Sequence, residues 1–405
     1  MAYENVVIVG AGHAGGCAAA ALRAASSGGR ITLVGNEKHP PYERPPLSKE
    51  LLAGAIPVEK TYLRPLNWYA ASNIELRLDT NVLGIDRAAG RLHLSDAESI
   101  PYDALLLTTG ARARTVTFAE PSHPRIFYLR DIDDSLALRQ RLTPGIRLAI
   151  IGAGFIGLEI AATARKAGCD VTVLELAPQP LARVAPPEIG AHVAELHRRN
   201  GVELRFGCSV EAIDAAEAAC TIHTGDAKIA ADLIAIGIGA VPNTELAKGA
   251  GLIVDDGVVV DQFGKTSDPN IFAAGDVTRH FNPILGRAIR LEAWQNAQNQ
   301  ATAVGAIIAG GEKPFAEVPW LWTDQYDMNM QVAGAAQRWD QLVYRGDPAG
   351  KSFMAFQLLN SKVVGAFSVN AAREMRFARI LISSGKAINA DLLADEKTKL
   401  QELSR

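Results

Sequence analysis

A glycine pattern typical of dinucleotide binding occurs twice in this chain. Residues 10–15 read GAGHAG and residues 152–157 read GAGFIG. In such a loop one glycine makes a tight turn, one lets the backbone approach a pyrophosphate, and one lets a helix pack closely on a strand. The residues expected to line the loops are Gly10, Gly12, Ala14 and Gly15 in the first, and Gly152, Gly154, Phe155, Ile156 and Gly157 in the second. The chemistry indicated is the binding of two dinucleotides.

Each loop must be positioned by a strand before it and a helix after it. The first follows the apolar run NVVIV (5–9) and leads into a small-residue helix and a second strand, ITLVG (31–35). The second follows RLAII (147–151) and leads into the helix LEIAATARKAG and the strand DVTVLE (170–175). The N-terminus of each helix offers free N–H groups and its positive dipole end to the phosphates. This context makes the pattern far more specific than its glycines alone.

The residue at the end of the second strand indicates which dinucleotide binds there. Glu175 ends that strand with no arginine immediately beside it. A carboxylate in this place accepts a hydrogen bond from the ribose 2′-OH of NADH and repels the 2′-phosphate of NADPH, so the second site is predicted to select NADH. In the first copy Asn36 and Glu37 follow the strand, and either could hold the adenosine ribose.

Length and composition favour a globular protein of several domains. The chain has 405 residues, of which 48% are hydrophobic and 21% charged, and its formal net charge is −3. Two or three domains are expected at this length. Nothing in the overall charge attracts the chain to nucleic acid or to an anionic membrane. No apolar run has membrane-spanning length, and the N-terminus enters a strand without a basic signal region, so a cytoplasmic protein is expected.

The cysteines and histidines do not predict a metal site. Four cysteines, at positions 17, 169, 208 and 220, lie far apart, and the eight histidines show no ligand spacing. Neither a zinc site nor an iron–sulfur site is therefore expected in this chain.

Segments along essentially the whole chain resemble the flavoprotein reductases with two dinucleotide sites, most closely the FAD- and NADH-dependent ferredoxin reductases of the putidaredoxin reductase type. They read PPYERPPLSKELL (40–52), LLLTTGARAR (105–114), FYLRDIDD (127–134), IGAGFIGLEIAATA (151–164), GIGAVPNTELA (237–247), IFAAGDV (271–277) and WLWTDQY (320–326). The resemblance implies an α/β fold with two Rossmann-like domains, the NADH domain inserted in the FAD domain. The FAD domain would comprise residues 1–112 and 240–317, and the NADH domain 113–239.

The last part of the chain changes to a period of two. Runs such as MNMQVAGAA, FMAFQLL and KVVGAFSV predict strands, Asn360-Ser361 predicts a hairpin turn, and a helical stretch follows. We expect residues 318–405 to form an antiparallel sheet with a covering helix, the α+β interface domain of the family. The oligomeric state is left open.

The resemblance also implies the roles of single residues. Asp276, after Gly275, would bind the ribityl chain of FAD, and Val82 would contact the adenosine through its backbone. Trp294, in the segment that runs beside the isoalloxazine in the family, would contribute backbone contacts to FAD. The other FAD contacts implied are Arg44, Lys49, Thr109, Gly110 and Arg130, and Gly239 is implied on the NADH side.

Lys49 and Glu159 are the implied catalytic pair. Related reductases place such a lysine near flavin N5 and pair it with a glutamate on the NADH-site helix. A cation there favours hydride transfer to the flavin. The alternative is that Lys49 is a solvated surface charge and Glu159 a carboxylate that only complements the helix dipole.

A missing cysteine separates the chain from the disulfide reductases of the same superfamily. Their redox cysteine would fall near residues 40–52, where this chain has none. Electrons are therefore expected to leave the flavin directly, as they would toward a one-electron carrier. The resemblance implies that this carrier is a [2Fe–2S] ferredoxin that serves a haem-thiolate monooxygenase or a ring-hydroxylating dioxygenase. The alternatives are an NADH-responsive redox sensor, or rubredoxin or oxygen as the acceptor.

The helix near the C-terminus carries a possible docking surface for an acidic ferredoxin. Arg373, Arg376 and Arg379 recur at three-residue spacing and lie broadly on one side of that helix. A solvated helix face is the plain alternative. Trp322 corresponds to the family's aromatic residue near the partner-facing edge of the flavin, and is the expected electron exit.

Overall fold

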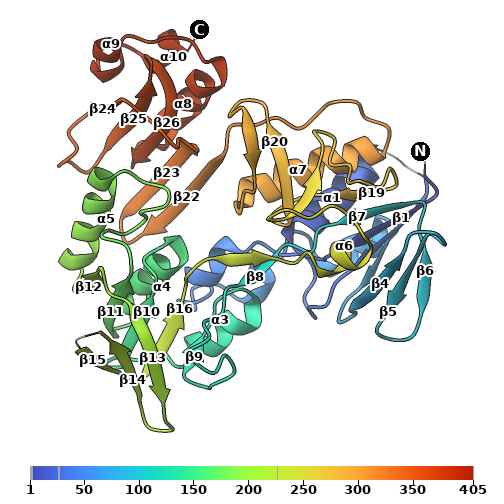
Figure 1. The fold of residues 1–405 in the computed structure, drawn as a ribbon, viewed down its shortest axis with the longest axis horizontal. Helices are drawn as coiled ribbons and strands as arrows, with labels where there is room; N and C mark the ends of the chain where they lie inside the picture. The colour runs from blue at the N-terminus through green and yellow to red at the C-terminus, as the bar shows by residue number, and fades with distance from the viewer. Residues whose placement is uncertain (1–2, 26–27, 226, 405) are drawn as a thin grey trace.

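The computed structural model describes residues 3–25, 28–225 and 227–404. Three bodies are visible in Figure 1: the N-terminal part at the right, the middle of the chain at the lower left, and the C-terminal part at the upper left. None of the described helices combines the length and the apolar character that crossing a bilayer requires.

The first parallel sheet contains strands from both parts of the predicted FAD domain, residues 1–112 and 240–317. Its strand order is β19-β7-β1-β2-β3, and all neighbouring strands are parallel. The strands are β1 (Asn5–Val9), β2 (Arg30–Val34), β3 (Ile74–Arg77), β7 (Ala104–Leu107) and β19 (Ile271–Ala273). Helices α1 (His13–Ala25) and α7 (Trp294–Ile308) pack together over one face. Small residues permit this close contact, since a Cβ added at Gly305 would lie 2.7 Å from the carbonyl oxygen of Ala18.

The second parallel sheet has the same architecture and lies within the first domain's sequence. Its order is β12-β11-β10-β16-β9, again with all neighbours parallel. The strands are β9 (Ile126–Phe127), β10 (Arg147–Ile151), β11 (Asp170–Glu175), β12 (Glu203–Phe206) and β16 (Leu233–Ile236), and the main helices are α3 (Ile132–Arg139), α4 (Phe155–Lys166) and α5 (Pro187–Arg199).

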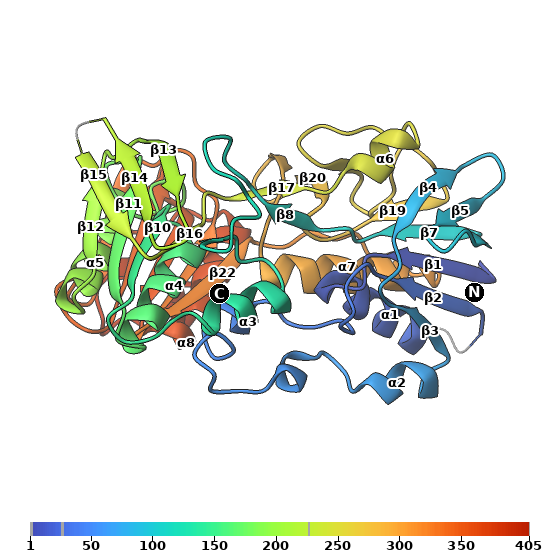
Figure 2. The ribbon, with the colours of Figure 1, turned by 90° about the horizontal axis from the view of Figure 1, so that it is seen from below.

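A two-stranded link connects the two parallel sheets. Strands β8 (Ala111–Ala113) and β17 (Ala240–Pro242) pair antiparallel and run between the sheets, which lie at opposite ends of the molecule in Figure 2. The expected insertion of one Rossmann-like unit into another is therefore confirmed. The boundaries at 112/113 and 239/240 stay a prediction, and both fall in this link.

Small sheets and short helices complete the two domains. In the FAD domain they are β4 (Val82–Asp86), β5 (Arg91–Leu94), β6 (Ser99–Pro101), β18 (Val258–Val260), β20 (Thr278–Asn282), β21 (Arg287–Ile289), α2 (Leu66–Ala71), α6 (Glu245–Gly249) and the 3₁₀ turns η1 (Pro45–Ser48) and η2 (Val58–Thr61). In the NADH domain they are β13 (Val210–Ala215), β14 (Cys220–Thr224) and β15 (Ala227–Ala231). Leu92 and Leu94 of β5 cover the face of the first sheet that α1 leaves open.

The C-terminal domain is the expected antiparallel sheet with a covering helix. Its order is β22-β23-β26-β25-β24, formed by β22 (Trp320–Gln325), β23 (Met328–Gly334), β24 (Gln341–Arg345), β25 (Phe353–Leu359) and β26 (Lys362–Val369). Helix α8 (Ala372–Ser384) packs on this sheet, and α9 (Ala390–Ala394) and α10 (Leu400–Leu403) follow. Asn360 and Ser361 have φ of +51° and +61°, as a two-residue hairpin turn requires. The other face of the sheet packs on α5 and shares its core.

Candidate active site

The first glycine loop is shaped by one close contact after another, with one open position. Gly10 has φ +111°, and a Cβ there would lie 2.2 Å from the carbonyl oxygen of Thr108. A Cβ at Gly15 would lie 2.0 Å from the carbonyl oxygen of Gly10, so the helix can pack this closely only without a side chain. At Gly12 the nearest atom is Nη2 of Arg44, 3.7 Å away. The space above Gly12 is where a pyrophosphate would approach the backbone.

The second loop repeats this geometry. Gly152 has φ +103°, with the carbonyl oxygen of Gly237 at 2.5 Å from an added Cβ. A Cβ at Gly157 would lie 2.1 Å from the carbonyl oxygen of Gly152, whereas at Gly154 the nearest atom is 4.0 Å away. Both loops therefore fit a pyrophosphate on the N-terminus of the following helix, α1 or α4.

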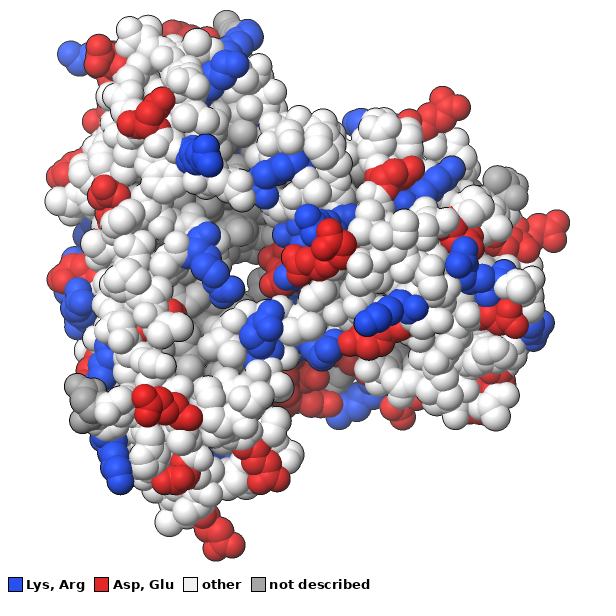
Figure 3. All heavy atoms as spheres, viewed as in Figure 1, with Lys and Arg blue, Asp and Glu red and all other residues white. Residues whose placement is uncertain are grey.

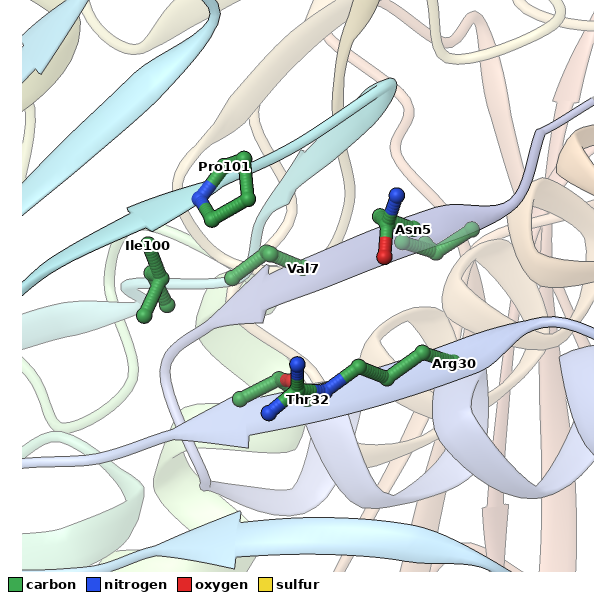
Figure 4. Close-up of a pocket in the computed structure, with 7 residues that line it drawn as sticks. Asn5, Val7, Arg30, Thr32, Ile100 and Pro101 are labelled. Atoms are coloured by element: carbon green, nitrogen blue, oxygen red, sulfur yellow. The ribbon is translucent and has the colours of Figure 1, made fainter.

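The surface has a large hollow between the bodies and a small pocket in the first domain, and the small pocket is not at the glycine loop. Figure 3 shows the surface hollowed between the right-hand body and the two left-hand bodies, with Lys and Arg side chains along its border. A small pocket of about 20 Å³ lies at the amino ends of β1 and β2, lined by Asn5, Val7, Arg30 and Thr32 among others (Figure 4). It has room for a water molecule, and it lies at the opposite end of these strands from the glycine loop. The dinucleotide loops, at the carboxyl ends, are the place where open α/β sheets bind ligands.

A polar chain joins four of the residues predicted to bind FAD. Arg44 donates from Nη2 to Oε1 of Glu37 at 3.0 Å and from Nη1 to the carbonyl oxygen of Arg130. Nη2 of Arg130 donates to Oδ2 of Asp276 at 3.1 Å. Tyr42, which sequence reasoning missed, donates to Oε2 of Glu37 at 2.5 Å. Residues from the ends of β2 and β19 and from two loops thus converge beside the first glycine loop.

The other predicted FAD residues lie along the same path. Asn36 is exposed, and the segment that precedes Val82 is bonded to the end of β2, since the Thr80 amide donates to the carbonyl oxygen of Gly35 at 2.9 Å. Thr109 is held by Asn243, whose Nδ2 donates to its carbonyl oxygen at 2.8 Å. A Cβ at Gly110 would lie 3.6 Å from Nη2 of Arg130, and one at Gly275 would lie 3.0 Å from Cβ of Ala14. Whether Asn36 or Glu37 holds the ribose stays open.

Several buried polar atoms near this path have no hydrogen-bond partner among the described residues. They are Nε1 of Trp294, Nε of Arg130 and Oδ1 of Asn296. A buried polar atom is rarely left without a partner in a folded protein. These atoms fit a cofactor that supplies the missing hydrogen bonds. Burial, followed by the nearby charge of Arg44, lowers the pKa of Arg130, and a bound pyrophosphate would offset that repulsion.

On the NADH side the carboxylate of Glu175 is held over the glycine loop. It accepts from the amide of Ala153 at 2.6 Å and from the amide of Ala177 at 2.8 Å. Phe155 and Ile156 begin α4 directly behind this loop, and Ile156 is 45% exposed. Arg183, which the sequence did not single out, has Nη2 3.4 Å from a Cβ built at Gly239. The predicted NADH residues therefore lie together beyond the carboxyl ends of β10, β11 and β16.

Lys49 and Glu159 meet where the FAD and NADH domains touch. Nζ of Lys49 donates to Oε2 of Glu159 at 2.8 Å, and the two side chains are only 13% and 4% exposed. Ser48 also donates to Oε2, and Thr323 of β22 donates to Oε1 at 2.7 Å. Lys49 is thus not a solvated surface charge. Its place near flavin N5 stays a prediction.

Comparison with known proteins decides the family. Residues 4–301 match the family model described as pyridine nucleotide-disulphide oxidoreductase, and residues 320–404 match that of the reductase C-terminal domain. The chain belongs to the pyridine nucleotide-disulphide oxidoreductase family. As a member it is an oxidoreductase, with FAD and NAD(H) as its cofactors.

Similar proteins cover this oxidoreductase from end to end. It is 42% identical to the ferredoxin–NAD(+) reductase component of the anthranilate 1,2-dioxygenase system of Burkholderia cepacia, over 99% of each chain. It is 38% identical to putidaredoxin reductase of Pseudomonas putida, over 99% of this chain and 97% of that protein. The structure of a covalent putidaredoxin reductase–putidaredoxin complex superposes with a TM-score of 0.95 at 38% identity, covering 99% of this chain and 98% of that chain.

Three tryptophans lead from the flavin domain of this oxidoreductase to α8. The rings of Trp294 and Trp322 meet edge to face with centroids 5.3 Å apart, and Trp322 stacks on Trp320 at 5.2 Å. The guanidinium of Arg379 lies 5.7 Å from the Trp320 ring and is half-buried, whereas Arg373 and Arg376 are exposed. The three arginines are therefore not equivalent: Arg379 packs on the tryptophans, whereas Arg373 and Arg376 are exposed, with the guanidinium of Arg376 over the ring of Phe377.

His13, in the first glycine loop, is buried at the start of α1. Its side chain lies against Trp294, with ring centroids 5.1 Å apart, and Nδ1 has no partner among the described residues. Burial, followed by the charge of Arg44, lowers the pKa of His13 from its usual 6.5 to about 4. The folded protein therefore resists protonation at this position more than the unfolded chain does.

This shift predicts a pH dependence of stability. The contribution of neutral His13 is complete above about pH 6.5 and is lost as the pH falls toward about 4, because the unfolded chain then binds the additional proton. Between pH 7 and 4.5 the wild-type apoprotein should lose about 2 kcal/mol more unfolding free energy than His13→Leu. Urea unfolding of both apoproteins at the two pH values measures this. Equal losses of unfolding free energy in the two proteins would contradict the lowered pKa of His13.

Proposed function

We propose that this chain is an NADH-dependent ferredoxin reductase that serves an oxygenase. The overall reaction converts NADH and two oxidised [2Fe–2S] ferredoxins into NAD⁺, a proton and two reduced ferredoxins. FAD, when bound, accepts a hydride and releases electrons one at a time. Because NADH is a cytoplasmic metabolite, we place the reaction in the cytoplasm.

The observation that carries this proposal is the contact between segment 40–52 and α4, the helix of the NADH site. The segment brings a lysine, Lys49, to Glu159 at 2.8 Å and contains no cysteine. A disulfide reductase of the family needs a cysteine that exchanges electrons with the flavin. The whole-length likeness to reductases named for their ferredoxin or putidaredoxin partners supports the same conclusion.

Different residues of the chain would bind NADH, bind FAD and assist hydride transfer. Glu175 and the loop at Gly152 would orient the adenine end of NADH, and Arg44, Arg130 and Asp276 would hold FAD. The positive charge of Lys49 would stand where negative charge develops as the hydride arrives, a placement that lowers the barrier because it needs no reorganisation. The anionic partner of Lys49, Glu159, keeps that cation in place.

Electrons would leave on the side of the tryptophans. Trp294, Trp322 and Trp320 form a continuous aromatic series that ends against Arg379 of α8. Arg373 and Arg376 stand exposed on the same helix. An acidic ferredoxin docked there would be steered by these charges and would meet the end of the series.

Charge reversal on α8 tests this docking surface. In the double variant Arg373→Glu/Arg376→Glu, the second-order rate of ferredoxin reduction should fall about tenfold or more at low salt, because the steering charges become repulsive. Flavin reduction by NADH should be unchanged. The wild-type rate should itself fall as salt is added, since exposed charges are screened over about 8–10 Å. Stopped-flow measurement of the two half-reactions separates these effects.

A matched control lies on α5. Arg198 and Arg199 are exposed there, and Arg198 lies over an aromatic ring as Arg376 does. Arg198→Glu/Arg199→Glu makes the same change in net charge away from the tryptophans and should leave ferredoxin reduction nearly unchanged. Equal slowing in both double variants would show that only overall charge matters and would remove the docking surface from α8.

A further inference from the structure

A chain of buried hydrogen bonds extends from Glu159 away from Lys49. Thr323 donates to Oε1 of Glu159 at 2.7 Å, and Nε2 of Gln325 donates to the Thr323 hydroxyl at 3.0 Å. Oε1 of Gln325 in turn lies 2.8 Å from Nε2 of His197 on α5. The exposed fractions of Thr323, Gln325 and His197 are all 0%. Glu159 was singled out from the sequence, but its connection through Thr323 and Gln325 to His197 was not.

Every donor in this series of hydrogen bonds points toward the carboxylate of Glu159. Because the Gln325 amide nitrogen is used on Thr323, its carbonyl oxygen faces His197, and Nε2 of the imidazole must carry the proton. Burial lowers the pKa of His197, which favours the neutral ring, and the acceptor Oε1 of Gln325 selects the tautomer with the proton on Nε2. Hydrogen bonds aligned in one direction polarise one another, and their common end is the anion of Glu159.

This series of hydrogen bonds connects elements of all three domains. Ser48 and Lys49 belong to the FAD domain, Glu159 and His197 to helices α4 and α5 of the NADH domain, and Thr323 and Gln325 to β22. Because side chains alternate along a strand, Thr323 and Gln325 share one face of β22, while Trp320 and Trp322 share the other. One strand therefore touches the Lys49–Glu159 pair on one side and the tryptophan series on the other.

We propose that Thr323, Gln325 and His197 are positioning residues, which hold the Glu159 carboxylate in the orientation that presents Lys49 to the flavin. This inference rests on the proposed function. Ser48 and Lys49 occupy Oε2, so Thr323 is the group that fixes Oε1. Without its hydroxyl, a buried oxygen of the carboxylate loses its donor, and the side chain can rotate with its lysine. Gln325 and His197 keep that hydroxyl turned toward Glu159.

Replacement of Thr323 by valine keeps the shape and removes the donor. The limiting rate of flavin reduction by NADH should fall about tenfold, the scale of a hydrogen bond to a charged group, while the dissociation constant for NADH stays within twofold. Thr323→Ser restores the hydroxyl and should stay within twofold of the wild-type rate. The midpoint potential of the flavin should become more negative in Thr323→Val and remain unchanged in Thr323→Ser. Thr224→Val, which removes another buried threonine hydroxyl bond, in β14, is the matched control and should change neither quantity.

The imidazole proton of His197 gives a readout that needs no turnover. In the wild-type protein Nε2–H should give an exchange-protected proton resonance by NMR, assigned by its loss in His197→Gln. In Gln325→Leu that resonance should shift and lose its protection, and flavin reduction should slow about threefold. Gln325→Leu also serves if Thr323→Val does not fold.

The inference is overturned if Thr323→Val or Gln325→Leu reduces its flavin at the wild-type rate and potential, or if Thr323→Ser is as slow as Thr323→Val. Failure of the proposed function looks different. In that case the wild-type protein itself does not take a hydride from NADH or does not pass electrons to ferredoxin.

Discussion

In Lys49→Met, reduction of the flavin by NADH should be about a hundredfold slower than in the wild-type protein. The variant removes a buried cation whose Nζ lies 2.8 Å from Oε2 of Glu159, and it leaves a side chain of similar length. The cation acts on charge that develops during hydride transfer, so the limiting rate should fall while NADH binding changes little. Anaerobic stopped-flow at several NADH concentrations measures both quantities.

Two further variants make this result specific. Lys49→Arg keeps the charge but changes its shape and should recover part of the rate. Lys60→Met removes an exposed lysine from the same loop region and should behave as the wild-type protein does. A Lys49→Met protein that reduces its flavin within threefold of the wild-type rate would exclude Lys49 from the reaction.

The choice between NADH and NADPH should depend on Glu175. The wild-type protein should prefer NADH by kcat/KM. Glu175→Ala alone removes the ribose acceptor and the repulsion of a 2′-phosphate. Leu176, the next residue, is 70% exposed, so Leu176→Arg can add a phosphate-binding cation without disturbing the core. The double variant Glu175→Ala/Leu176→Arg should lower the NADH-to-NADPH ratio of kcat/KM by about a hundredfold or more, the combined scale of two charged contacts.

The ratio is the informative quantity, because Glu175 also accepts hydrogen bonds from the amides of Ala153 and Ala177. Loss of those bonds should lower both kcat/KM values together. Leu176→Arg by itself is the control and should change the ratio only a few-fold while Glu175 still repels the phosphate. A wild-type preference for NADPH would refute the assignment of the second site.

The fold was largely predictable because a short stretch of sequence, a strand followed by a glycine loop, identifies each parallel unit. The strands at 5–9 and 147–151 lead directly into glycine loops whose spacing has a geometric cause, and both form as predicted. The C-terminal sheet was predictable from its period of two and from the Asn360-Ser361 turn. The small sheets formed by β4–β6 and by β18, β20 and β21 were not predicted, since their short strands carry no clear alternation.

The site was less predictable where it depends on contacts between domains. Spacing along α8 indicated that Arg373, Arg376 and Arg379 share a side, but it could not show that Arg379 packs on Trp320. The alternation along β22 places Thr323 and Gln325 on one face without saying what that face meets. His197 and Glu159 are separated from them by more than a hundred residues, and only the packed structure brings the four together.

A comparison of electron acceptors tests the proposed ferredoxin reductase activity most directly. Under anaerobic conditions, NADH is mixed with the FAD-loaded protein and either an acidic [2Fe–2S] ferredoxin or glutathione disulfide, and the absorbance of NADH and of the iron–sulfur centre is followed. We expect two ferredoxins to be reduced per NADH consumed and the disulfide not to be reduced. Rapid reduction of the disulfide, or NADH-reduced protein that transfers no electrons to any ferredoxin tested, would contradict the proposed activity.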